Sequence, residues 1–208
     1  MNSTVYLYVF DTMADWEVAY LNAELHAGRY FKKGRNPLKL VTISNTKAPI
    51  VTMGGLRVIP DIEIDELIME ETAALILPGG NTWTQPFHEA IIKMARECLM
   101  AGAVVGAICG ATMGLAESGI LDQRWHTSND LEYLKMTCPN YVGEKYYKKE
   151  LAVTDGNLIT ATGIAPLEFT LHILKTLNVF STQTLDAWYN LYKTQESKYF
   201  HDLMNSIQ

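Results

Sequence analysis

Residues 103–119, AVVGAICGATMGLAESG, are the stretch that most restricts how this chain can fold. An apolar run leads directly to Cys109 and passes, without any Pro, Asn or Asp, into a helical pattern. Small residues surround the cysteine, because Ala107 lies two positions before it and Gly110 and Ala111 follow it. The pattern predicts a strand, a sharp turn and a helix, with the turn lifting the Cys109 side chain out of a sheet.

A cysteine at this turn is a candidate nucleophile. At the start of a helix, unpaired N–H groups and the helix dipole favour the thiolate over the thiol. The alternative is a buried structural cysteine at the end of a strand, which is a common place for free Cys. On this stretch alone, both interpretations of Cys109 remain open.

The rest of the chain alternates between short apolar runs and segments with helical spacing. The apolar runs predict strands at residues 4–10, 38–44 and 73–77, a hairpin at 49–59, and two late strands at 150–154 and 157–162. Helical spacing predicts helices at residues 16–27, 86–100, 131–136, 166–177 and 184–205, and residues 61–71 are acidic and weakly helical. This alternation is typical of an α/β protein with a mostly parallel central sheet and helices on both faces.

The length and composition favour one domain. At 208 residues, with 48% hydrophobic and 19% charged residues, the chain suits a single domain spanning residues 1–208. The spacing predicts that residues 184–208 form a C-terminal helical extension, and this segment is rich in aromatic residues. We expect this extension to pack on the body of the domain or across a subunit interface.

The charge and cysteine content exclude several classes of protein. The net charge of −6 comes without a long run of Lys and Arg, so we expect no nucleic-acid partner. No apolar run reaches membrane-spanning length, and the first residues do not resemble a signal peptide. Three widely spaced cysteines fit a reducing cytoplasm, and no Cys and His spacing resembles a metal site.

Three predicted loops should meet at one edge of the sheet. In open parallel sheets, ligands bind beyond the carboxyl ends of the strands. Residues 11–17 follow the first strand, residues 78–80 follow the strand at 73–77, and Cys109 ends its own strand. We therefore expect the functional site to be built from these three segments.

The sequences of these segments resemble the ThiJ/PfpI family, the superfamily of Parkinson disease protein 7. The matching motifs are ADWE at 14–17, LILPGG at 75–80, AICGAT with LAESGIL within 107–121, His126, TDGNLITATG at 154–163 and PLEF at 166–169. The resemblance implies a flavodoxin-like three-layer sandwich of the class I glutamine amidotransferase type, with the extra C-terminal helix outside the common core.

The resemblance also implies roles for individual residues. Cys109 matches the family's nucleophile, and Glu17 matches the acidic residue that approaches it and shares its proton. The backbone N–H groups of Gly79, Gly80 and Gly110 are candidates for holding an oxyanion. His126 matches a position near the cysteine.

Each of these residues also has a simpler structural interpretation. Glu17 is favoured in the first turn of any helix, so Asp15 is the alternative inward-facing carboxylate. The glycines also suit an ordinary turn, and His126 also suits a hydrogen-bonded or surface position.

Three tryptophans also fall near the expected site. Trp16, Trp83 and Trp125 lie in predicted loops or helix starts, where they would wall a pocket or cover the edge of the core.

One departure from the family pattern restricts the function. Peptidase-like members carry a histidine directly after the nucleophilic cysteine, whereas this chain has Gly110. The resemblance therefore favours a cofactor-independent hydrolase or glyoxalase-like enzyme, acting on a small electrophilic substrate, over a protease. The alternatives are a redox-sensing or chaperone-like protein, in which Cys109 is oxidised, and a retired enzyme that kept the fold. The family also implies a homodimer.

Overall fold

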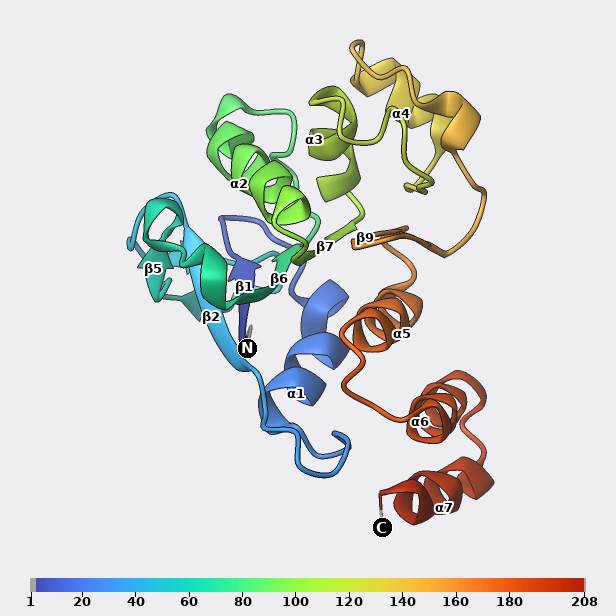
Figure 1. The fold of residues 1–208 in the computed structure, drawn as a ribbon. Helices are drawn as coiled ribbons and strands as arrows, with labels where there is room; N and C mark the ends of the chain where they lie inside the picture. Colours follow the sequence, from blue (N-terminus) through green and yellow to red (C-terminus); the bar gives the residue numbers. More distant parts are fainter. Residues whose placement is uncertain (1–2, 208) are drawn as a thin grey trace.

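A seven-stranded sheet forms the centre of the molecule in a computed structural model that describes residues 3–207 (Figure 1). Its strand order is β5-β2-β1-β6-β7-β9-β8. Every neighbouring pair is parallel except β8 and β9, which run antiparallel. The strands are β1 Thr4–Tyr8, β2 Lys39–Ser44, β5 Ile62–Glu63, β6 Thr72–Leu77, β7 Val104–Ile108, β8 Ala152–Asp155 and β9 Leu158–Ala161.

Helices cover both faces of this sheet, so the predicted three-layer α/β sandwich is confirmed. Helices α1 (Ala19–Ala27) and α5 (Pro166–Thr176) lie on one face, and α2 (Glu89–Met100) and α3 (Ala111–Glu117) lie on the other (Figure 1). The short helix α4 (Leu131–Thr137) packs beside α3. Because both faces are covered, the central strands β1, β6 and β7 are buried along their whole length, which explains their continuous apolar runs.

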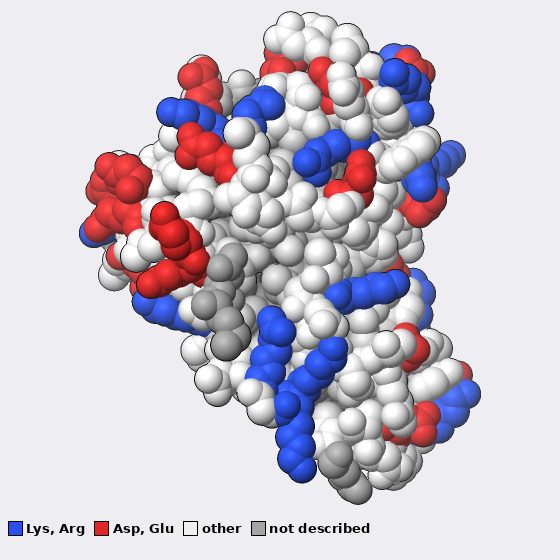
Figure 2. Space-filling model, in the orientation of Figure 1, with Lys and Arg blue, Asp and Glu red and all other residues white. Residues whose placement is uncertain are grey.

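The acidic stretch at residues 61–71 differs from its weakly helical prediction. It forms the edge strand β5 and two short 3₁₀ helices, Ile64–Glu66 and Met69–Glu71. Strand β5 pairs with β2, and Asp61 accepts hydrogen bonds from the backbone N–H and the hydroxyl of Thr42, both at 2.7 Å. Asp61 and Thr42 lie 19 residues apart, so the spacing of residues within 61–71 does not predict their hydrogen bonds. Figure 2 shows acidic side chains gathered around this edge of the sheet.

The predicted last helix is two helices, α6 (Thr182–Thr194) and α7 (Ser197–Ser206). The break falls at Gln195, which adopts a left-handed conformation with φ of 62° and donates its N–H to Leu191 O. On the inner side of α6, Trp188 is fully buried, and its indole N–H donates to Glu24 of α1 at 3.2 Å. The aromatic extension therefore packs on the body of the domain through Trp188.

A separate two-stranded hairpin, β3 (Ile50–Val51) and β4 (Arg57–Val58), confirms the hairpin predicted at residues 49–59, and its turn contains Gly54 and Gly55. It lies next to the loop after β1, because Thr12 and Met53 donate backbone N–H groups to Val51 O and Met13 O, both at 2.9 Å. Across residues 3–207, the helices are all too short or too polar to span a membrane.

Candidate functional site

Cys109 occupies the sharp turn between β7 and α3. Its φ is 58°, a left-handed value that is unusual for a residue other than glycine. Its N–H donates to Ala161 O at 3.0 Å, and its own carbonyl accepts the N–H and the hydroxyl of Thr112 at 3.1 and 2.6 Å. These bonds hold the backbone in a conformation that costs about 1–3 kcal/mol and is typical of functional sites. The strand, cysteine and helix follow one another as the sequence predicts.

Two glycine backbones form the walls around the Cys109 side chain. A Cβ atom on Gly163 would lie 2.7 Å from the sulfur, and one on Gly79 would lie 2.7 Å from Cys109 Cβ. Any side chain at either position would therefore overlap the cysteine. The thiol itself is half-buried, whereas Cys98 and Cys138 are buried.

The carboxyl group of Glu17 is buried against the same two glycines. Glu17 belongs to a short 3₁₀ helix, Asp15–Val18, directly after the loop that follows β1, and its side chain is fully buried. Its Oε2 accepts the N–H of Gly79 at 2.6 Å. Its Oε1 has no hydrogen-bond partner among the described residues, and a Cβ on Gly163 would lie 3.2 Å from it. The structure thus brings the predicted thiol and carboxyl together beside Gly163.

The surroundings of the two groups raise both of their pKa values. Burial raises the pKa of Glu17 above its ordinary value of 4.5, against the hydrogen bond from Gly79. Burial, and then the negative charge of Glu17, raise the pKa of the Cys109 thiol to about 11. Because each ionised group disfavours the other, the thiolate forms most readily when Glu17 carries the proton.

The three glycines that are candidates for holding an oxyanion differ in whether their N–H groups already have a partner. Gly79 already gives its N–H to Glu17, so it is not free to bind an oxyanion. The backbones of Gly80 and Gly110 lie against each other, because a Cβ on Gly110 would be 3.0 Å from Gly80 O and 3.5 Å from Gly80 N. Within residues 3–207, the N–H of Gly80 makes no hydrogen bond, whereas the N–H of Gly110 faces the Cys109 side chain and lowers the pKa of its thiol. Gly80 therefore keeps a free donor, and the Gly110 N–H lies directly beside the reacting sulfur.

A cavity of about 480 Å³ opens beside the thiol. Trp16 and Ile164 contribute an apolar rim, with 49% and 86% of their surfaces exposed. Its described lining contains one charged residue, Glu17, and neither Lys nor Arg. The lining residues are Trp16, Glu17, Cys109, Asn129, Gly163, Ile164 and Pro166.

Of the three tryptophans and Asp15, which were expected near the site, Trp16 lines this cavity and the other three residues do not. Asp15 accepts the hydroxyl of Thr52 at 2.7 Å, which ties it to the β3–β4 hairpin. Trp83 is buried and donates its indole N–H to Pro78 O at 2.9 Å. Trp125 is half-exposed and packs edge-on against Tyr146.

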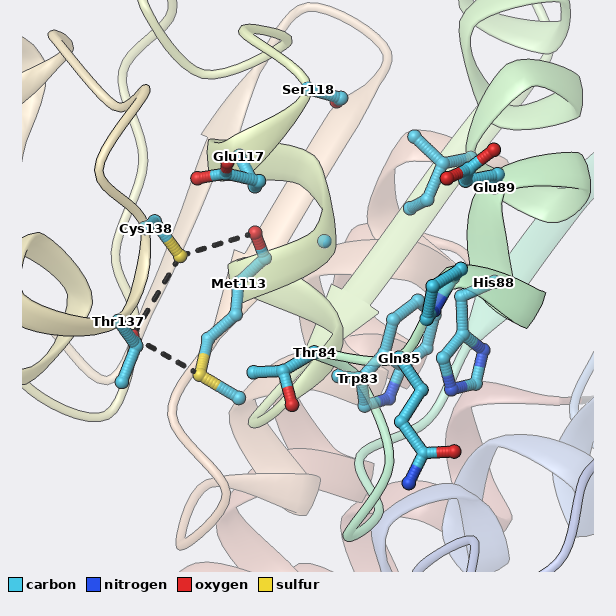
Figure 3. Close-up of a pocket in the computed structure, with 13 residues that line it drawn as sticks. Trp83, Thr84, Gln85, His88, Glu89, Met113, Glu117, Ser118, Thr137 and Cys138 are labelled. Atoms are coloured by element: carbon cyan, nitrogen blue, oxygen red, sulfur yellow. Dashed lines mark hydrogen bonds between the residues drawn. The ribbon is translucent and has the colours of Figure 1, made fainter.

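Trp83 lines a second cavity of about 360 Å³ between α2 and α3 (Figure 3). Met113 of α3 lies at its edge, and its sulfur accepts the hydroxyl of Thr137 at 3.5 Å. The thiol of Cys138 donates to Met113 O at 3.4 Å. These contacts join the end of α4 to α3, so Cys138 has a packing role.

His126 is fully buried, and both of its ring nitrogens have other partners. Nδ1 lies 2.7 Å from Arg124 O, and Nε2 lies 2.7 Å from the hydroxyl of Tyr141. Neither nitrogen makes a hydrogen bond with Cys109 in the described part of the chain. The structure therefore does not bring His126 into direct contact with the candidate nucleophile.

Asn129, three residues after His126, contacts the sulfur instead. Its side-chain amide donates to Cys109 Sγ at 3.3 Å. The sequence analysis missed this residue because its spacing from Cys109 carries no chemical signal. The one feature of the sequence that pointed to Asn129 was its position in the loop after His126.

A model of the DJ-1/PfpI family matches residues 3–176. The chain belongs to the DJ-1/PfpI family. The match ends with the last residue of α5, so α6 and α7 lie beyond the part that the family model covers.

Two of the similar proteins match almost the entire chain, and a third matches about two thirds of it. The crystal structure of a ThiJ/PfpI family protein from Bacillus anthracis is 54% identical, with a TM-score of 0.97 over 100% of this chain and 98% of that one. The "uncharacterized protease YoaZ" of Bacillus subtilis is 54% identical over 98% of this chain and 97% of its own length. The "glutathione-independent glyoxalase DJR-1.2" of Caenorhabditis elegans is 26% identical over 69% of this chain and 75% of its own length.

Proposed function

We propose that this protein is a cofactor-independent cysteine enzyme of the hydrolase or glyoxalase type. In this proposal, Cys109 adds to the carbonyl carbon of a small electrophilic substrate. The observation that carries the proposal is the placement of the Cys109 thiol and the buried Glu17 carboxyl against the same glycine, Gly163. A carboxyl group in this position serves as the proton acceptor that a weakly acidic thiol requires.

The reaction begins with a proton transfer from the Cys109 thiol to the Glu17 carboxylate. The sulfur then forms a bond to the carbonyl carbon, and the π electrons of the carbonyl move onto its oxygen. The N–H groups of Gly80 and Gly110 stabilise the resulting oxyanion. Glu17 returns its proton to this oxygen, which gives a neutral thiohemiacetal from an aldehyde.

The next step depends on the substrate. An ester or amide would expel its leaving group from the tetrahedral adduct, and water would then cleave the thioester. With a 2-oxoaldehyde, the carbinol C–H proton moves to the neighbouring carbonyl carbon and the carbinol O–H proton moves to the oxygen of that carbonyl, which gives the thioester of a 2-hydroxy acid. Water releases this acid and restores the thiol, so the atoms balance.

The lining of the cavity favours a neutral substrate. A carboxylate or phosphate ligand would require a cationic partner, and the described lining offers none. The apolar rim of Trp16 and Ile164 suits a small alkyl or aryl group beside the carbonyl. The glyoxalase name of DJR-1.2 supports this substrate class, and Gly110 in place of a histidine argues against extending the protease name of YoaZ to this chain.

The test is a screen of neutral 2-oxoaldehydes, esters and amides against the wild type, Cys109→Ser and Cys109→Ala. We expect both variants to lose turnover, and we expect an active substrate to protect Cys109 from iodoacetamide. Cys138→Ser is the matched control, because it removes a buried thiol that lines the other cavity and should leave turnover intact. Full turnover by Cys109→Ser would overturn the mechanism.

One observation also favours a redox-sensing function as the second candidate. Of the three cysteines, Cys109 is half-buried and the other two are buried, so an oxidant in solution reaches Cys109 first. Mass spectrometry after mild peroxide treatment separates the two functions. Selective oxidation of Cys109, combined with no turnover on the substrate panel, would favour the sensor.

A further inference from the structure

The side-chain amide of Asn129 connects two parts of the site. Its nitrogen donates to Cys109 Sγ at 3.3 Å, and its oxygen accepts the N–H of Gly163 at 2.8 Å. We infer that Asn129 is a catalytic residue of this site, whose N–H group stabilises the thiolate of Cys109 as it forms and attacks. The inference rests on the proposed function and deepens it, by naming the donor that the direct His126 contact does not provide.

The orientation of the amide follows from its partners. A backbone N–H can only donate, so the group of Asn129 that faces Gly163 must be the carbonyl oxygen. The NH₂ group is then the one that faces the sulfur. In the reversed orientation, the NH₂ group would oppose the N–H of Gly163, and the amide oxygen would oppose a developing negative charge.

Hydrogen bonds hold the loop that carries Asn129 on both sides of this residue. Before it, the N–H of Thr127 donates to the Thr160 hydroxyl at 2.9 Å, and the Thr127 hydroxyl donates to Glu150 O at 2.8 Å. After it, Asp130 caps α4 by accepting the N–H of Tyr133 at 2.8 Å. These bonds hold the loop, and with it the Asn129 amide, in place. Asn129 itself is exposed at the mouth of the cavity, so its amide is accessible to a substrate.

His126 lies at the start of the segment that carries Asn129 and is held there by its own hydrogen bonds. Its ring fills a fully buried site between Arg124 O and the Tyr141 hydroxyl. Its backbone N–H donates to Tyr146 O at 3.1 Å, and its carbonyl accepts the N–H of Lys148 at 2.8 Å. The histidine therefore fixes the start of the segment that presents Asn129 to the sulfur.

The contribution of this donor depends on the charge of the sulfur. An N–H group binds a thiolate more strongly than a neutral thiol, because the bond is then charge-assisted. The Asn129 amide lowers the pKa of the Cys109 thiol, against the larger effects of burial and of the Glu17 charge. Removing the donor should therefore raise the pH at which Cys109 reacts.

Asn129→Asp and Asn129→Ala together test this inference. The aspartate keeps the shape of the side chain and an oxygen for the N–H of Gly163, but it replaces the donor to sulfur with an acceptor. The alanine removes both bonds without adding a charge. Asn190→Asp is the matched control, because Asn190 is bonded to Asp186 O within α6 and the substitution adds the same charge elsewhere.

The measurements are the rate of Cys109 alkylation by iodoacetamide as a function of pH, localised by mass spectrometry, and turnover on an active carbonyl substrate. We expect both Asn129 variants to move the alkylation midpoint to higher pH. Turnover at neutral pH should fall about 10- to 100-fold, which corresponds to one lost charge-assisted hydrogen bond. Asn190→Asp should match the wild type in both measurements.

The outcomes also separate this inference from the proposed function. If Asn129→Asp alkylates and turns over like the wild type while Asn129→Ala is impaired, Asn129 is only a tether for Gly163 and the inference is overturned. The proposed function then stands, provided that Cys109→Ser is inactive. If Cys109→Ser retains turnover while Asn129→Asp still shifts the alkylation midpoint, the proposed function fails and Asn129 remains a donor to the sulfur.

Discussion

Glu17 accepts the backbone N–H of Gly79 at 2.6 Å, and this bond links two segments that lie 62 residues apart. The link gives the buried carboxyl its one hydrogen bond within the described residues and leaves its second oxygen, Oε1, without a partner. Gly79 also contacts Cys109 so closely that no side chain fits between them. The distance between acid and thiol is therefore set by a backbone rather than by a flexible side chain.

Gly79→Ala should disrupt both the stability and the reactivity of the site. The new Cβ would lie 2.7 Å from Cys109 Cβ and from Glu17 Oε2. Glu17 is fully buried and Cys109 is fixed in its turn, so neither can move away. We expect a loss of about 1–3 kcal/mol in the free energy of unfolding, measured with urea, together with altered Cys109 alkylation.

A glycine far from the site provides the comparison for that variant. Gly34→Ala meets no atom within 4 Å, so its cost comes from the left-handed φ of 82° alone. It should lower stability without changing the alkylation of Cys109. Wild-type stability and alkylation in Gly79→Ala would show that the backbone adapts, and that Gly79 does not set the geometry of the pair.

Glu17→Gln should separate thiol reactivity from turnover. Removing the carboxylate charge lowers the pKa of Cys109 below about 11, so alkylation should reach its midpoint at lower pH. Turnover should nevertheless fall by about 10²–10⁴, because a glutamine neither accepts the thiol proton nor returns it to the oxyanion. Parallel alkylation and steady-state assays measure the two effects, and Glu70→Gln, at an exposed position, is the control.

The same variant should change the pH dependence of stability. Burial raises the pKa of Glu17 in the folded state, so its contribution is fully present below the unfolded value near 4.5 and is lost as pH rises through the folded pKa. Glu17→Gln should therefore gain stability relative to the wild type at neutral pH, by about 1–3 kcal/mol for a buried group with an unpaired oxygen. An equal difference at pH 4.5 and pH 8 in urea titrations would contradict this explanation.

The features that the sequence predicted well are those encoded by local spacing. The apolar runs of β1, β6 and β7 and the small residues around Cys109 are continuous in the chain, and each element appears close to its expected position. The meeting of residues 11–17 with Cys109 followed from the rule that loops gather at the carboxyl ends of parallel strands, and the family resemblance pointed to Glu17 within that segment. The family resemblance supplied the expected roles of the individual site residues.

The missed features depend on contacts between distant residues or on the direction of a single bond. The edge strand β5 is two residues long and is defined by its pairing with β2. Gln195 ends α6 in a left-handed conformation without a glycine or proline to signal the break. Whether His126 or Asn129 faces the sulfur depends on side-chain orientation, which periodicity does not encode.

His88 should make the protein sensitive to acid. Its ring is buried, stacks on Trp83, and bonds to the hydroxyls of Tyr8 and Thr82. Burial lowers its pKa from 6.5 to about 4. The unfolded chain therefore takes up a proton that the folded chain resists, so this stability is present above pH 6.5 and is lost as pH falls toward 4.

The loss from this one group amounts to about 3 kcal/mol at pH 4, at about 1.4 kcal/mol per pKa unit. His88→Gln should remove this part of the pH dependence, although its stability at pH 7 will be lower because the stacked ring is gone. Urea unfolding at several pH values between 4 and 8 measures the effect. His201→Gln, at an exposed histidine, should keep the wild-type slope; an unchanged slope in His88→Gln would assign the acid sensitivity to other groups.

Trp188→Ala should show that the C-terminal helices belong to the cooperative fold. Trp188 is fully buried between α6 and the body, and its indole N–H is bonded to Glu24, whose other oxygen has no partner within residues 3–207. Truncation leaves a large cavity and weakens the hydrogen bonding of a buried carboxyl. The free energy of unfolding should fall by about 3–5 kcal/mol.

Phe200→Ala on α7 is the matched control for that truncation, because this ring is 48% exposed. It should cost less than about 0.5 kcal/mol. Circular dichroism and tryptophan fluorescence, followed through the same urea titration, should give coincident transitions in the wild type. Separate transitions, or a Trp188→Ala variant as stable as Phe200→Ala, would mean that α6 and α7 unfold independently of the sheet that carries Cys109.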